Sequence, residues 1–161
     1  MKSWNEFSAE QPELAEQGKR MLFRIREHVG LVFIATLRKD GAPRLHPISL
    51  ILSQGHAYVI IPRASPKCTD LLRDGRYALQ APPPPDNEDS EEFYLAGCAA
   101  QIKAPIVQQA LIDDTGITVE ENEILFELFL ERAMYTKLVN QGAPDEHPLH
   151  QTWRAYSTTQ A

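Results

Sequence analysis

The chain has 161 residues and a formal net charge of −6 at pH 7, from 22 acidic and 16 basic side chains. This length suits one domain over residues 1–161, and the acidic balance argues against a nucleic-acid binder and against a partner of anionic membranes. No stretch approaches the roughly 18 apolar residues of a membrane span, and the N-terminus lacks the apolar core of a signal peptide. We therefore expect a cytoplasmic protein in which Cys68 and Cys98 are reduced.

The first predicted element is an amphipathic helix over residues 11–29. Pro12 suits a first helical turn, apolar residues recur at spacings of three and four, and Gly30 supplies a stop. The apolar stripe consists of Leu14, Gly18, Leu22, Ile25 and Val29.

Three antiparallel strands are predicted next, over residues 30–38, 44–52 and 56–61. They are rich in β-branched and aromatic residues, and short turns separate them. Asp40-Gly41 is typical of a tight hairpin. The three strands therefore form a meander.

A short helix follows within "RASPKCTDLLRDGR", residues 63–76. Ser65 can cap it, Pro66 fits its first position and Gly75 ends it. Strands are then predicted over residues 76–81 and 93–102, with Gly97 marking a bulge or a close backbone approach. Between them, "PPPPDNEDSEE" cannot pair and predicts an exposed, stiff loop.

The C-terminal part is predicted as a helical insert over residues 104–140 and a closing strand at about 151–157. The insert holds a short helix over residues 105–114 and a longer one from Glu120 to Asn140, preceded by a capping box of Thr118 and Glu121. Six or so strands with no βαβ rhythm favour a mainly β protein, a small antiparallel barrel with flanking helices, over a doubly wound sheet.

The start of the helix at Ser65 is a candidate anion site. Backbone N–H groups at a helix start are unpaired and lie at the positive end of the dipole, and Lys67 adds a charge there that the helix itself disfavours. Arg44 and His46 share one face of the second strand, so Arg44 can approach Arg63 at the end of the third. The alternatives are an ordinary helix opening with a solvated Lys67, an exposed Arg44 and a hydrogen-bonded His46.

No metal site is predicted. His147 and His150 are three residues apart, but Pro148 opposes a helix there, and the acidic loop lacks the spacing of a calcium site. No nucleophile elbow is present, and Cys68 is expected to be a buried thiol.

Three stretches, in this order, resemble the pyridoxamine 5′-phosphate oxidase-like, FMN-binding split-barrel family. They are "FIATLRKDGAPRLHPISLIL", "AYVIIPRASPKCTDLLRDGRYALQA" and "EEFYLAGCAAQI", within a barrel over residues 30–103. The resemblance implies a six-stranded antiparallel split β-barrel that works as a homodimer, with FMN in two clefts between the subunits. Glu91 and Glu92 stand where the oxidase has basic residues and glutamine, so its own substrate is not implied.

The resemblance also implies the residues that contact the cofactor. It assigns the FMN phosphate to three residues and adds Arg63 as a fourth, and it lays part of the second strand along the flavin. A C-terminal aromatic residue and an arginine would close the site, either from the same chain or from the partner subunit. The phosphate residues are Arg44, Ser65 and Lys67, the strand residues are His46, Pro47 and Ile48, and the closing residues are Trp153 and Arg154.

The expected function is an FMN-binding flavoprotein that moves hydride or electrons between a reduced donor and a small organic acceptor. No acid or base is indispensable, and His46 is the candidate. One alternative keeps the fold with a deazaflavin in place of FMN. Another is a non-catalytic flavin or haem binding protein, with His46, His147 or His150 as the axial ligand. The tetraproline loop and the helix from Glu120 to Asn140 could cover the flavin edge.

Overall fold

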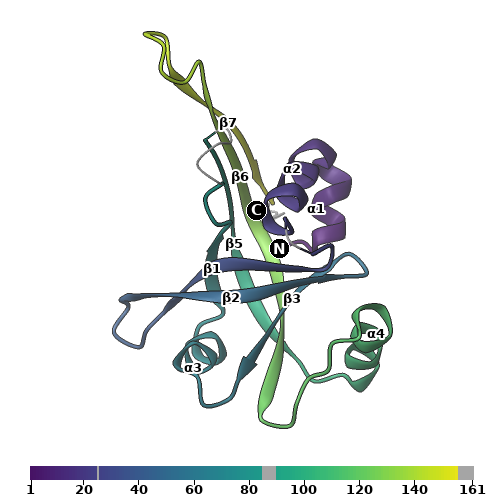
Figure 1. Ribbon diagram of the computed structural model, residues 1–161. Coiled ribbons are helices and arrows are strands. Elements are labelled where there is room, and N and C mark those ends of the chain that lie inside the picture. The colour runs from purple at the N-terminus through teal and green to yellow at the C-terminus, as the bar shows by residue number, and fades with distance from the viewer. Residues whose placement is uncertain (25, 85–89, 156–161) are drawn as a thin grey trace, which may run out of the picture.

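The computed structural model describes residues 1–24, 26–84 and 90–155. Within these ranges the chain forms seven strands and four helices (Figure 1). The strands are β1 (Val29–Leu37), β2 (Pro43–Ser53), β3 (His56–Pro62), β4 (Arg76–Gln80), β5 (Glu91–Ile102), β6 (Glu123–Val139) and β7 (His147–Arg154). The helices are α1 (Trp4–Glu10), α2 (Pro12–Leu22), α3 (Pro66–Arg73) and α4 (Pro105–Thr115).

Six of the strands close into an antiparallel barrel. The strand order is β3-β2-β1-β4-β5-β6-β7, and a further pairing of β3 with β6 closes the ring. β7 is an extra strand on the outer edge of β6. The prediction of a mainly β, six-stranded antiparallel split barrel is therefore confirmed.

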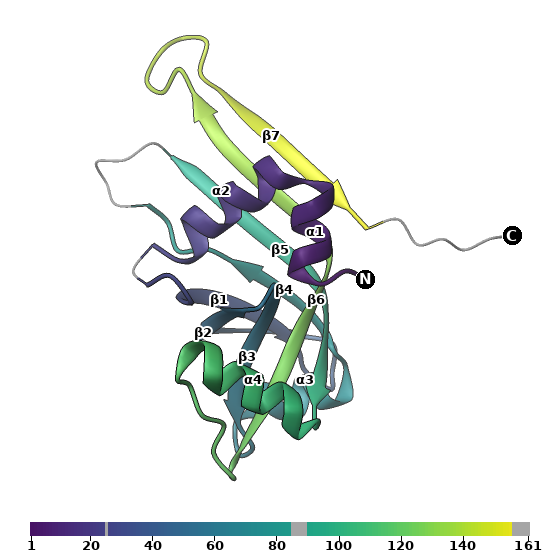
Figure 2. The ribbon, with the colours of Figure 1, turned by 90° about the vertical axis from the view of Figure 1, so that its right-hand side faces the viewer.

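The long strands β5 and β6 run out of the barrel and form a sheet extension with β7 (Figures 1 and 2). Helices α1 and α2 cover one face of this extension, where α2 contacts β5 and β6. Helix α3 lies at the other end of the barrel, against β1, β3 and β5.

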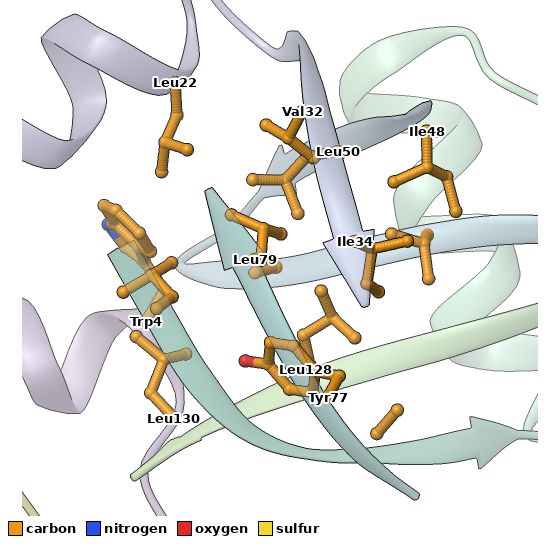
Figure 3. Packing of buried hydrophobic residues seen from close by; sticks show 14 of the residues in the cluster. Trp4, Leu22, Val32, Ile34, Ile48, Leu50, Tyr77, Leu79, Leu128 and Leu130 are labelled. Atoms are coloured by element: carbon orange, nitrogen blue, oxygen red, sulfur yellow. The ribbon is translucent and has the colours of Figure 1, made fainter. Parts of the chain in front are cut away.

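The barrel interior is filled by alternate side chains of the strands, as the two-residue period of a strand requires. Val32, Ile34, Leu50 and Leu79 point toward one another and are almost fully buried (Figure 3). This core continues beneath α1 and α2 through Trp4 and other residues. A second, smaller cluster lies under α4 and consists of Ile51, Tyr58, Leu111 and Leu125.

The helix predicted from Glu120 to Asn140 is wrong, because residues 123–139 form strand β6. Near its start β6 is buried on both faces, by the barrel core on one side and by the α4 cluster on the other. The strand alternation is therefore blurred, and leucine, glutamate and methionine also favour a helix. Pairing with both β3 and β5 outweighs that propensity. Within the predicted insert, only the short helix was correct, as α4.

The helix predicted over residues 11–29 is also too long. It ends at Leu22, Val29 opens β1, and Ile25 lies outside the described residues. Gly30 is a strand residue rather than the helix stop. A Cβ atom on Gly30 would lie 1.9 Å from the Leu22 carbonyl oxygen, so this glycine lets the end of α2 pack on β1. Helix α1, capped by Ser3 and Glu6, was not predicted.

Two further boundaries differ. The closing strand, predicted at 151–157, spans His147–Arg154, and residues 156 and 157 lie outside the described part of the chain. The same holds for residues 85–89 of the tetraproline loop. The described helices include none long and apolar enough to cross a bilayer.

Candidate cofactor-binding site

The start of α3 offers two polar groups that the rest of the described chain leaves unused. Ser65 is the N-cap residue, yet its hydroxyl makes no capping hydrogen bond, and Pro66 takes the first helical position. The Lys67 ammonium has no ion-pair partner among the described residues. Pro66 has no N–H, and the Cys68 N–H donates to the Ser65 carbonyl. Within the described chain, the Lys67 N–H is therefore the free backbone donor of this turn. Together these groups form an anion-binding arrangement.

A buried carboxylate, Asp70, lies one turn further along α3 and is 3% exposed. Its Oδ2 accepts hydrogen bonds from Arg44 Nε at 2.8 Å and from Thr36 Oγ1 at 3.0 Å. Its Oδ1 accepts one from Arg73 Nη1 at 3.3 Å. Burial alone raises the pKa of the Asp70 carboxyl, but hydrogen bonds from Arg44, Thr36 and Arg73 outweigh burial and hold that pKa below its usual range.

Arg44 is therefore brought to α3 by a charged hydrogen bond. Only its Nε is used by Asp70, and its two Nη groups have no partner within the described ranges. The Arg44 side chain is 24% exposed, so these groups can reach a ligand. With Lys67 and Arg73 also present, the positive charges here outnumber the single carboxylate of Asp70.

The other predicted residues of β2 divide between its two faces. Ile48 is buried in the barrel core, and Pro47 lies on the outside, opposite Phe33 of β1. His46 is partly buried, and its Nε2 atom is buried without a hydrogen-bond partner. Pro47 is therefore the one of these three that lies on the exposed face of β2.

Arg63 is fastened to the segment that precedes β6. Its Nε donates to the Glu121 carbonyl at 3.2 Å, and its backbone N–H donates to the Asn122 carbonyl at 2.8 Å. It lines a cavity of about 490 Å³ together with Lys103. The nearby Cys68 is a free, buried thiol whose pKa is raised by burial, an effect that the Arg63 charge partly offsets.

The structure does not bring Trp153 and Arg154 to the start of α3. Trp153 is buried under α1, where its ring lies 4.8 Å from that of Phe7 and its Nε1 donates to Glu10 at 3.1 Å. Helix α3 packs instead against β1, β3 and β5. Arg154 is exposed and lies opposite Arg132 across β6 and β7.

An apolar surface lies on the outside of β1 and β2. Leu31, Phe33 and Leu45 are 52%, 37% and 66% exposed, and Pro47 lies among them. We call these four residues the outer apolar face. Exposed apolar patches of this kind typically mark contact sites of a protein.

Sequence reasoning missed Asp70, Thr36 and Arg73. Asp70 lies three residues after Lys67, which places both on one side of the helix. That spacing was visible in the sequence. The hydrogen bonds of Asp70 to β1 and β2 were not, because they depend on how α3 closes the end of the barrel.

No protein-family model matches the chain, and no curated protein matches its sequence. Solved structures do share its fold. A heme-binding protein from Mycobacterium smegmatis superposes with a TM-score of 0.63 at 17% identity over 89% of this chain, which spans only 59% of that protein. PhzG from Burkholderia lata 383, in complex with tetrahydrophenazine-1-carboxylic acid, gives 0.63 at 10% identity, over 96% of this chain and 89% of PhzG. A NimC/NimA family protein from Clostridium acetobutylicum gives 0.55 at 12% identity, over 85% and 90%. These similarities show the split-barrel fold.

Proposed function

We propose that this protein is a homodimeric flavoprotein that binds FMN and transfers hydride or electrons to or from a small organic molecule. The observation that carries the proposal is the anion-binding arrangement at α3. Asp70 holds Arg44 beside a helix start whose Ser65 hydroxyl and Lys67 ammonium have no partner in the described chain.

A phosphate monoester suits this arrangement. An arginine fork, a lysine point charge, a hydroxyl and the backbone N–H of Lys67 together supply donors for the three terminal oxygens of such a group. The excess of positive over negative charge favours a dianion. Arg44, Ser65 and Lys67 are the residues that we assign to the phosphate, with Arg63 on the outer side of the same helix start.

The ring system of the cofactor would extend from the phosphate along β2, past His46, Pro47 and Ile48. Pro47 supports this placement, because it belongs to the outer apolar face and offers an apolar contact for a flat ring. A second copy of the chain, packed on the outer apolar face, would cover the ring on its other side. Trp153 and Arg154 would then contribute from the partner subunit, because in their own chain they lie on β7, whereas α3 packs against β1, β3 and β5.

When bound, the flavin supplies the hydride chemistry, and the chain supplies binding and orientation. Arg44 and Lys67 hold the phosphate end, while the second subunit excludes water from the ring. His46 lies on the opposite face of β2 from Pro47, and its Nε2 is buried without a hydrogen-bond partner in the described chain, so we assign it no step in the chemistry.

A deazaflavin would use the same phosphate contacts, so it remains an alternative cofactor. Haem is a second candidate because a heme-binding protein shares the fold. Haem needs an accessible imidazole nitrogen as axial ligand. The buried Nε2 of His46 does not offer one, and His147 and His150 lie on the exposed β6–β7 extension. The arrangement at α3 suits a phosphate, which a flavin nucleotide carries and haem lacks, and so it favours a flavin.

The test is equilibrium titration of the purified protein with FMN, a deazaflavin and haemin, each followed by its visible absorption band. FMN should bind most tightly and quench its fluorescence. Preferential uptake of haemin with a Soret band, lost in His→Ala variants and kept in Lys67→Ala, would establish the haem alternative. A protein that takes up none of the three contradicts the proposal.

A further inference from the structure

We infer that Asp70 is a positioning residue for the anion site: by binding the Nε–H of Arg44, it presents the Nη groups of that arginine to the cofactor phosphate. This inference rests on the proposed function and adds to it the residue on which recognition of the phosphate depends.

The first argument is the burial of the Asp70 charge. A carboxylate that is 3% exposed needs several donors to offset its lost hydration, and Asp70 has three, from Thr36, Arg44 and Arg73. A buried ion pair is often no more stabilising than an apolar contact of similar size. Stability alone therefore gives little reason for a buried aspartate in a helix whose next residue, Leu71, packs in the core.

The second argument is that the two carboxylate oxygens of Asp70 bind different elements. Oδ2 accepts hydrogen bonds from Thr36 and Arg44, which are paired residues on β1 and β2. Oδ1 accepts a hydrogen bond from Arg73 of the same helix. Asp70 thereby joins α3 to the β1–β2 pair. Because the guanidinium is planar and rigid, fixing its Nε also fixes the direction of both Nη groups.

The third argument is that positioning and simple electrostatics predict opposite signs. A carboxylate near a phosphate repels it, so neutralising Asp70 should strengthen phosphate binding if charge alone matters. If Asp70 positions Arg44, neutralising it should weaken phosphate binding, because the guanidinium then loses its fixed direction. Asp70→Asn keeps the size of the side chain and separates these two effects.

The experiment compares the dissociation constants of FMN and riboflavin, which differ by the phosphate. For Asp70→Asn we expect the riboflavin-to-FMN ratio of dissociation constants to fall about tenfold, the usual scale for a charged hydrogen bond, while the riboflavin constant itself changes less than about twofold. Arg44→Met should lower the ratio less in Asp70→Asn than in the wild type, because Asp70→Asn has already weakened the contact of Arg44 with the phosphate.

Asp74→Asn is the matched control. Asp74 is the C-cap of the same helix and pairs with Arg76 at 2.6 Å, so it undergoes the same change of charge without touching Arg44. The riboflavin-to-FMN ratio of dissociation constants in Asp74→Asn should equal that of the wild type. A ratio that rises in Asp70→Asn, or that falls equally in Asp74→Asn, overturns the inference, as does an equal loss of affinity for both flavins.

Two further measurements keep the inference testable if Asp70→Asn folds poorly or no flavin binds. Thr36→Val retains the buried charge but removes one donor to Oδ2, and it should lower the ratio in the same direction by about two- to fivefold. In the ligand-free wild type, the Arg44 Nε–H should give a separate, slowly exchanging NMR signal that Asp74→Asn preserves. An averaged Arg44 signal refutes positioning, whereas an ordered signal in a protein that binds neither flavin supports positioning and refutes the flavin proposal instead.

Discussion

Gly97 of β5 lies directly against the backbone of Phe129 on β6. A Cβ atom built on this glycine would be 1.9 Å from the Phe129 carbonyl oxygen. The contact coincides with a shift of register, in which Ala96 pairs with Arg132 but Gly97 pairs with Leu130. Such a bulge sharpens the local twist and bend of a strand pair. On β6 it lies between the part that pairs with β3 in the barrel, which ends at Glu127, and the part that pairs with β7, which starts at Arg132.

Gly97→Ala should therefore destabilise the fold by about 3 kcal/mol, because the added methyl group meets backbone atoms that no rotamer change can move. Chemical denaturation measures the loss. Ala100→Ser, on an exposed position of the same strand, is the control and should change stability by less than about 0.5 kcal/mol. Equal stability of Gly97→Ala and the wild type would mean that the two strands can separate here at no cost.

Lys67→Ala should weaken FMN binding by about 1.5–3 kcal/mol, the usual contribution of a hydrogen bond to a charged group. Riboflavin should bind the variant as it binds the wild type, because Lys67 is assigned to the phosphate alone. Fluorescence titration gives both constants, and Lys19→Ala on the distant helix α2 is the matched control. Unchanged FMN affinity in Lys67→Ala would remove this lysine from the site.

The free energy of unfolding should fall at acid pH because of the buried Asp70 carboxylate. The pKa of Asp70 is lowered in the folded protein, whereas in the unfolded chain it returns to about 3.9. The unfolded state therefore takes up the proton first as the pH falls. The stabilisation is complete above about pH 5 and is lost progressively below pH 4, as the pH falls through the folded pKa.

Wild type should accordingly exceed Asp70→Asn in free energy of unfolding by about 3 kcal/mol at pH 7, and the difference should shrink between pH 5 and pH 2.5. Urea denaturation at a series of pH values measures it. A difference that stays constant down to pH 2.5 would show that the Asp70 pKa is the same in both states.

The sequence predicted the first three strands of the barrel but not strand β6. The strands of residues 30–62 were predictable because a turn with Asp40-Gly41 and a β-branched, aromatic composition act locally. The bulge or close approach at Gly97 was likewise predicted and is confirmed. Strand β6 was not, because pairing with β3 and β5 and the cover of α4 decide its conformation, and its own local pattern does not show these contacts.

The same limit applies to the candidate site. Ser65 and Lys67 were identified from a local pattern, and the structure keeps them at the start of α3. The partner of Arg44 could not be identified, because the sequence suggested an approach to Arg63 at the end of the third strand. The structure instead joins Arg44 to Asp70 and ties Arg63 to the carbonyl of Glu121. The hydrogen-bond partner of an arginine near the surface depends on tertiary packing.

The outer apolar face yields a prediction about the assembly. Phe33→Glu should weaken the proposed homodimer at least about 30-fold, because a buried aromatic side chain near the centre of an interface typically contributes 2 kcal/mol or more. Phe33 is 37% exposed and lies between the more exposed Leu31 and Leu45, so a charge there would be desolvated by a second copy but tolerated in a monomer. Sedimentation analysis over a range of concentrations measures the dissociation constant.

Ile106→Glu provides the control for this prediction. Ile106 is 79% exposed on α4 and does not belong to the outer apolar face, so its charge should leave the dimer intact. Phe33→Glu should also weaken both FMN and riboflavin, because the second subunit is proposed to cover the ring rather than the phosphate. That pattern separates it from Lys67→Ala, which should affect FMN alone. A wild type that stays monomeric at high micromolar concentration, or a Phe33→Glu monomer that binds FMN with undiminished affinity, would place the cofactor within a single chain.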